Sequence, residues 1–119
     1  MVNIFDYIGQ CKVNIKKDII KLARLNFASF EDANPEKHPQ TAWDVWREQC
    51  EDAFRNDIDK YLDDISYKLC QYYGINDNSF IVKDFRNILL RNIDELNLYN
   101  RENREKLYSQ YGIEIYPEE

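Results

Sequence analysis

Carboxylates are the side chains of this sequence whose number and spacing could do chemistry. Between Glu31 and Asp64, eleven Asp and Glu residues meet only four Lys and Arg residues, which gives this segment a net charge of −7. The whole 119-residue chain carries −6, so the rest of the chain is close to neutral. A dense group of carboxylates attracts cations and raises the rate at which a basic partner associates.

Five of these carboxylates fall on one side of the segment at the 3.6-residue period of a helix. Their spacing predicts a helix that buries its tryptophans and phenylalanine and turns its carboxylates outward. We expect this side, called the acidic face below, to bind a basic protein surface. A solvated face without a partner is the alternative that the pattern leaves open. The predicted partner-binding residues are Asp44, Glu48, Asp52, Asp59 and Asp63.

Paired carboxylates suggest a second chemistry. Glu48 and Glu51, and likewise Glu102 and Glu105, have the Glu-x-x-Glu spacing with which helical nucleotide pyrophosphohydrolases hold magnesium through hard oxygen ligands. The Glu-x-x-Asp pair that usually accompanies it is missing. A small magnesium-dependent all-α nucleotide pyrophosphohydrolase is therefore an alternative. The expectation is a protein that is no enzyme, with no catalytic residue, metal or cofactor.

The other reactive side chains show no catalytic arrangement. His38, the only histidine, lies in a proline-flanked stretch without an acid or nucleophile nearby in the sequence. Three cysteines, odd in number and far apart, are typical of small buried residues in a reducing compartment and not of a disulfide framework or zinc knuckle. They are Cys11, Cys50 and Cys70.

Composition excludes several classes of function. A pI near 4.8 opposes attraction to phosphates, and the basic residues of segment 1–30 are spread around the predicted helix, so no direct binding of nucleic acid is expected. No apolar run approaches the roughly 18 residues of a membrane span. The N-terminus lacks a basic segment followed by an apolar one. We expect a cytoplasmic protein with no membrane partner.

Helices are the elements that must position the carboxylates. With three Gly and three Pro, the chain has little material for the tight turns of a β-sandwich or barrel, and 44% hydrophobic residues suffice for one core. The expected fold class is all-α, a compact bundle of three to four helices that forms a single domain over residues 1–119. The predicted core is Ile15, Ile19, Trp43, Trp46, Phe54, Ile65, Phe85, Leu89 and Ile93.

The first helix begins after Asn3, which can cap it, and carries an apolar stripe at spacings of three and four residues. A second apolar stripe recurs every seven residues on roughly the opposite side, so this helix needs cover on two faces. Either the helix lies at the centre of the bundle or the second stripe is a homodimer seam. The possible dimer seam is Val13, Ile20 and Phe27.

A proline-containing loop over residues 29–40 precedes one long helix around residues 42–73. Thr41 with Asp44 resembles a shortened capping box at its start, and Gly74 predicts a left-handed C-cap at its end.

Two further helices are expected before a C-terminal tail at residues 113–119, with Asn100 as the N-cap of the second. The sequence Tyr-Gly-Ile at 73–75 recurs at 111–113. Too few preceding residues match to indicate a duplicated unit, so shared capping chemistry is the interpretation we favour.

In length, acidity, expected helix content and its opening Asn3-Ile4-Phe5-Asp6, the chain resembles phage antirestriction proteins that mimic DNA. The resemblance covers this short stretch, and the net positive charge of residues 1–30 departs from their near-uniform acidity. Carboxylates four residues apart on a helix advance about 6 Å, against 3.4 Å per phosphate of single-stranded DNA. Strict mimicry therefore requires a second acidic helix or a dimer mate.

These patterns predict an acidic helical protein that binds and inhibits a basic, nucleic-acid-handling enzyme, such as a nuclease or a CRISPR or restriction effector. A phage or mobile-element counter-defence protein of the anti-restriction or anti-CRISPR type fits this description. An immunity protein or antitoxin that neutralises a basic toxin is the alternative with the same physical basis.

Overall fold

The computed structural model describes residues 3–33 and 39–113 and folds them into four α-helices. In chain order these are α1 (Ile4–Glu31), α2 (Gln40–Tyr73), α3 (Phe80–Glu95) and α4 (Arg101–Gln110). No strand is present within the described residues. The all-α prediction and the prediction of one long helix around residues 42–73 are confirmed.

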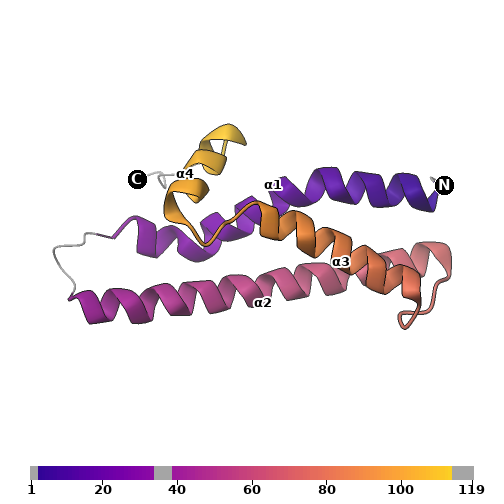
Figure 1. The fold of residues 1–119 in the computed structure, drawn as a ribbon, viewed down its shortest axis with the longest axis horizontal. Coiled ribbons are helices and arrows are strands. Elements are labelled where there is room, and N and C mark those ends of the chain that lie inside the picture. The colour runs from indigo at the N-terminus through magenta and orange to yellow at the C-terminus, as the bar shows by residue number, and fades with distance from the viewer. Residues whose placement is uncertain (1–2, 34–38, 114–119) are drawn as a thin grey trace.

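The two long helices, α1 and α2, run side by side in opposite directions, and α3 packs on both of them (Figure 1). α2 is continuous over 34 residues, which corresponds to about 51 Å at 1.5 Å per residue. α4 lies across the C-terminal half of α1 and packs on no other described helix. The bundle is elongated, with extents of 54 × 27 × 24 Å. None of the described helices is both long and apolar enough to cross a membrane.

Side-chain caps begin three of these helices. The side-chain oxygens of Asn3, Ser79 and Asn100 each accept a hydrogen bond from a backbone N–H two or three residues later, at 2.8, 3.1 and 3.0 Å. Each bond satisfies a donor that the first turn of a helix leaves without a partner. The predicted caps Asn3 and Asn100 are confirmed.

Glycine ends α2 as predicted. Gly74 has the left-handed backbone angles φ 61° and ψ 37°, and the N–H of Ile75 donates to the carbonyl five residues earlier at 3.1 Å. Gly112, after α4, has φ 67°, and the N–H of Ile113 makes the same bond at 2.8 Å. Both pairs have the geometry of a left-handed C-cap, so shared capping chemistry accounts for the repeated Tyr-Gly-Ile.

The connection between α1 and α2 is shorter than the predicted loop 29–40. Residues 29–31 belong to α1, because the Glu31 side chain is held by buried groups on α4 that are described below. Residues 34–38, which include His38, and the tail beyond Ile113 lie outside the described residues.

The predicted capping box at the start of α2 is wrong. The helix already begins at Gln40, with Pro39 in the N-cap position and no side-chain hydrogen bond to the first turn. Thr41 is therefore inside the helix, two residues after the N-cap position, and does not form the predicted capping box with Asp44.

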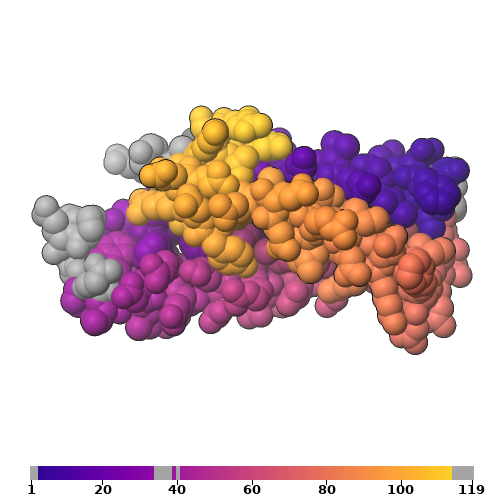
Figure 2. All heavy atoms as spheres, viewed as in Figure 1, coloured from indigo at the N-terminus to yellow at the C-terminus, as the bar shows by residue number. Residues whose placement is uncertain are grey.

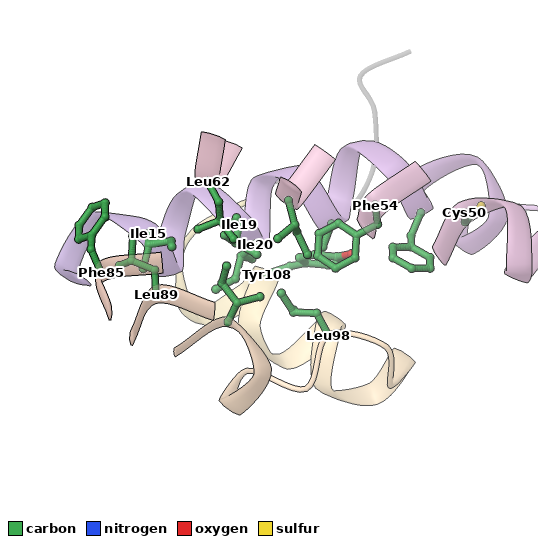
Figure 3. Close-up of a cluster of buried hydrophobic side chains, with 14 of the residues drawn as sticks. Ile15, Ile19, Ile20, Cys50, Phe54, Leu62, Phe85, Leu89, Leu98 and Tyr108 are labelled. Atoms are coloured by element: carbon green, nitrogen blue, oxygen red, sulfur yellow. The ribbon is translucent and has the colours of Figure 1, made fainter. Parts of the chain in front are cut away.

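The core lies between α1, α2 and α3, with additional side chains from α4 and the segment before it. Figure 3 shows Ile20 of α1, Phe54 of α2, Leu98 of the segment before α4 and Tyr108 of α4 in one cluster. Six of the nine predicted core residues are buried. They are Ile15, Ile19, Phe54, Phe85, Leu89 and Ile93.

Trp43, Trp46 and Ile65 are only half-buried, which corrects the predicted core. The first turns of α2 extend past the part of the bundle that α3 covers (Figure 1). There the two indoles stack on each other with ring centroids 5.5 Å apart, and each makes an edge-to-face contact with the Phe30 ring on α1. The tryptophans thus close one end of the α1–α2 pair instead of filling its centre.

The second apolar stripe of α1 is covered within the chain. Ile20 and Phe27 are completely buried, whereas Val13 is exposed. α4 and the residues that lead into it occupy the place that a second copy would need, so Ile20 and Phe27 do not form the predicted dimer seam. In its C-terminal half, α1 therefore lies at the centre of its own bundle, which was the alternative to a dimer seam.

Candidate partner-binding face

The carboxylates of the acidic face lie along one side of α2. Glu48, Asp52, Asp59 and Asp63 are exposed to solvent, and Asp44 is half-buried. Because α2 is unbroken, the five residues form a single row about 29 Å long at 1.5 Å per residue. Such a row is long enough to contact several cationic side chains of one partner.

Three of the five carboxylates form an ion pair with an arginine. The pairs are Asp44 with Arg47 at 3.5 Å, Asp52 with Arg55 at 3.0 Å and Asp63 with Arg86 at 2.5 Å. Ion pairs between exposed side chains contribute at most about 1 kcal/mol. A cation from a partner can therefore replace these arginines at little cost.

Glu48 and Asp59 form no ion pair within residues 3–33 and 39–113. Along α2 as a whole, eight carboxylates face four cations, a net charge of −4. Arg86, which reaches over from α3, reduces the local charge by one. The acidic face is thus most strongly negative around Glu48 and Asp59.

A single row of carboxylates bordered by Arg86 is a poor copy of DNA. One such row supplies roughly half the charge per unit length of a nucleic-acid strand. The neighbouring helix contributes a cation at this border and not a second acidic row. The described residues therefore do not supply the charge density that strict mimicry of DNA requires.

The two Glu-x-x-Glu pairs stay apart. Glu48 and Glu51 lie on α2, whereas Glu102 and Glu105 lie on α4, which among the described helices packs on α1 and not on α2. Glu51 pairs with Arg47 at 3.7 Å, and Glu105 pairs with Arg101 at 3.2 Å. Among the described residues, no group of three or more His, Cys, Asp or Glu side chains is placed to hold a metal ion.

The cysteines pack against the core. Cys50 is buried, and Cys11 and Cys70 are half-buried. Burial raises the pKa of the Cys11 and Cys50 thiols, which disfavours the thiolate that acts as a nucleophile or metal ligand.

A buried group of charged side chains, not predicted from the sequence, joins α1 to α4. Glu31 Oε2 accepts a hydrogen bond from Arg104 Nε at 3.0 Å, and Oε1 accepts one from Arg24 Nη1 at 3.3 Å. The Tyr108 hydroxyl donates to Oε1 at 3.1 Å. The side chains of Glu31 and Arg104 are only 4% and 3% exposed. We call these four residues the Glu31 network.

Further contacts satisfy the arginines of the Glu31 network. Arg104 Nη1 donates to the carbonyl of Leu98 at 3.0 Å, and its guanidinium carbon lies 3.9 Å from the centre of the Phe27 ring. Arg24 also pairs with Asp32 at 3.1 Å. Two cations therefore face two carboxylates. Buried charges are tolerated only when paired and hydrogen-bonded in this way, so the network holds α4 in one position on α1.

The sequence contained a signal for this network. Arg24 and Glu31 each follow a residue of the second apolar stripe, Ile20 and Phe27, by four positions. Charged side chains on an otherwise apolar helix face indicate a buried ion pair. The charge count for residues 31–64 included Glu31 together with the carboxylates of α2. Glu31 lies on α1, however, and is separate from them.

Two tyrosines, Tyr108 in the core and the half-buried Tyr61, should make the fold sensitive to alkaline pH. Burial, and then the charge of Glu31, raises the pKa of Tyr108, while burial and the 2.6 Å hydrogen bond to Asp18 raise that of Tyr61. A folded-state pKa above the unfolded value of about 10 gives stability that is complete below pH 10 and is lost above it.

We therefore expect the free energy of unfolding to fall from about pH 10 upward, and to fall less steeply in Tyr61→Phe and Tyr108→Phe. Urea unfolding followed by circular dichroism between pH 8 and pH 11.5 measures this slope. If the free energy of unfolding of both variants falls with pH as steeply as that of the wild type, these tyrosines are not the source of the pH dependence.

Compared with protein-family models, with curated protein sequences and with solved structures, the chain has no match in any of the three.

Proposed function

We propose that this protein is a non-enzymatic inhibitor that docks the acidic face of α2 on the basic surface of a nucleic-acid-handling enzyme. One observation carries the proposal. Glu48 and Asp59 are exposed on an unbroken helix, and no cation of the described chain neutralises them. A basic cleft that binds nucleic acid has the complementary charge.

The physical basis is electrostatic steering followed by exchange of ion pairs. Unpaired carboxylates extend the negative potential into solvent, which raises the association rate with a basic surface. On contact, the partner's Lys and Arg side chains compete with Arg47, Arg55 and Arg86, whose exposed pairs are weak.

The proposed setting is cytoplasmic counter-defence by a phage or mobile element against a nuclease or a CRISPR or restriction effector. Its support is the acidity and small size of the chain and its resemblance to antirestriction proteins at Asn3-Ile4-Phe5-Asp6. An immunity protein or antitoxin would use the same face, and the identity of the partner distinguishes the two.

Charge reversal tests the proposal. The wild-type protein is immobilised, partners are captured from host cells, and the captured enzyme is purified. In Glu48→Lys/Asp59→Lys, we expect the association rate with this enzyme to fall about tenfold or more at low salt and to lose most of its salt dependence. Inhibition of the enzyme's activity on nucleic acid should weaken in parallel.

Asp94→Lys/Glu95→Lys is the matched control, because it makes the same charge change on exposed residues at the end of α3. Lysine is favourable in the last turn of a helix. If both double variants bind equally fast, the acidic face of α2 is not the docking site.

A further inference from the structure

Gly9 lies inside α1, where the fold gives no reason for a glycine. Its backbone is helical, and a Cβ atom added there would meet nothing within 4 Å. Glycine weakens a helix interior relative to alanine. Close approach of the backbone by another molecule is one use of a glycine at such a position.

Gly9 forms the floor of an open groove on the surface of α1. Phe5 and Val13, one helical turn to either side, are large apolar residues that are 78% and 75% exposed. Asp6, Gln10 and Asn14 complete the lining. We call this surface the Gly9 groove. Its two apolar walls with a gap between them have the shape that receives the ridge of a packed helix.

The Gly9 groove continues an interface that is already filled farther along α1. Val13 is the first residue of the stripe that contains Ile20 and Phe27, and these two are covered by the chain's own α4. Figure 1 shows α4 over the C-terminal half of α1 and no helix over the N-terminal half on that side. In Figure 2 the indigo half of α1 forms a bare upper edge beside α4.

The exposed apolar surface extends from α1 onto α3. Phe80 and Ile81 are exposed at the start of α3 and share a hollow of about 160 Å³ with Phe5 and Ile8. Contiguous exposed apolar residues of this kind mark interaction sites in folded proteins.

Lysines border the Gly9 groove. Lys12 follows Gly9 by three positions, and Lys16 and Lys17 follow Val13 by three and four, so all three side chains flank the groove. They are exposed and form no ion pair within the described part of the chain. Asp6, which lines the groove, carries one negative charge against these three positive charges, so the border of the groove is net positive.

We propose that the Gly9 groove binds an amphipathic helix of a partner protein, with an apolar stripe and acidic flanks. The stripe packs between Phe5 and Val13, the glycine lets the two backbones approach closely, and the acidic flanks pair with the lysines. A second copy of this chain fits less well, because a symmetric contact would bring the same lysines together from both sides. This surface is separate from the acidic face of α2 and adds a second partner.

A synthetic peptide tests the proposal. The probe is a labelled helical peptide of about 20 residues, with leucine along one stripe and glutamate beside it; a second peptide replaces every glutamate with lysine. Fluorescence anisotropy should detect binding of the acidic peptide only. Gly9→Leu and Val13→Asp should each weaken it about tenfold or more, as expected when a buried apolar contact is lost.

Gly9→Ala provides a readout that a purely structural role would not give. Alanine should raise the melting temperature, because the site is open within the chain, and should still weaken peptide binding by holding the two backbones apart. Leu25→Asp is the matched control, since Leu25 lies on the same helix, is 73% exposed and is not part of the groove. Glu48→Lys/Asp59→Lys should bind the peptide as the wild type does.

Several results would overturn this inference. They are absence of binding by the acidic peptide, equal binding of the lysine peptide, and unchanged affinity in Gly9→Leu. Sedimentation that shows wild-type dimers which Gly9→Leu dissociates would assign the groove to a second copy instead.

Discussion

Glu31→Ala is expected to lower the free energy of unfolding by about 3–5 kcal/mol, the usual effect of removing one partner from a buried ion pair. Arg104, at 3% side-chain exposure, would be left without its carboxylate, and the Tyr108 hydroxyl would lose its acceptor. The desolvation of the buried guanidinium is then no longer offset by a carboxylate. Urea unfolding at pH 7 measures the loss.

Two controls separate this effect from a general loss of charge. Asp59→Ala removes an exposed carboxylate that makes no ion pair in the described chain and should change stability by less than about 0.5 kcal/mol. Replacing the pair by apolar residues, as in Glu31→Leu/Arg104→Met, should recover much of the loss, because no buried charge is then unpaired. A Glu31→Ala variant as stable as Asp59→Ala would show that the network is open to solvent.

Phe27→Ala is expected to destabilise the chain by about 3–5 kcal/mol, as removal of a buried aromatic side chain does. Phe27 is completely buried, its ring centroid is 5.7 Å from that of Phe54, and the Arg104 guanidinium lies over its face. The substitution leaves a cavity and also removes the cation–π contact. Urea unfolding, together with sedimentation at micromolar concentration, gives both stability and oligomeric state.

The same variant decides between a core and a dimer seam for this residue. At a seam, Phe27→Ala would weaken association and leave the unfolding of the monomer nearly unchanged. In the core, it should destabilise the monomer whatever the oligomeric state. Val13→Ala, on the exposed part of the stripe, should cost less than about 0.5 kcal/mol and serves as the reference.

The charge segregation of the chain corresponds to two distinct surfaces. Within the described residues, Glu48 and Asp59 on α2 form no ion pair, and neither do the lysines that border Gly9 on α1. Each surface suits a partner of the opposite sign. The two proposals are independent, because the two surfaces share no residue and the charge reversal on α2 is expected to leave peptide binding at the Gly9 groove unchanged.

The helices and their limits were largely predictable from local patterns. Asn3 and Asn100 cap helices as expected, and Gly74 and Gly112 end them, because these effects involve only neighbouring backbone groups. The row of carboxylates on α2 was predictable for the same reason, since helical periodicity alone places residues four apart on one side.

The structure differs from prediction where the outcome depends on which helix covers which face. Trp43 and Trp46 have the periodicity of core residues, yet they lie beyond the cover of α3 and are half-buried. Ile20 and Phe27 have the spacing of a seam, yet α4 buries them. Periodicity identifies an apolar face but not the element that covers it, because that choice depends on contacts between residues far apart in the chain.

By itself, the sequence determined an all-α fold, one long uninterrupted acidic helix and the residues that start and stop its neighbours, because each of these follows from interactions within a few residues. Only the tertiary structure decided that Glu31 belongs to a buried network with Arg104 and Tyr108, more than 70 positions away in the sequence, and lies apart from the carboxylates of α2. It also decided that no other part of the described chain covers the face of α1 at Gly9. Both outcomes depend on where α4 packs along α1, which is set by long-range burial and the pairing of buried charges.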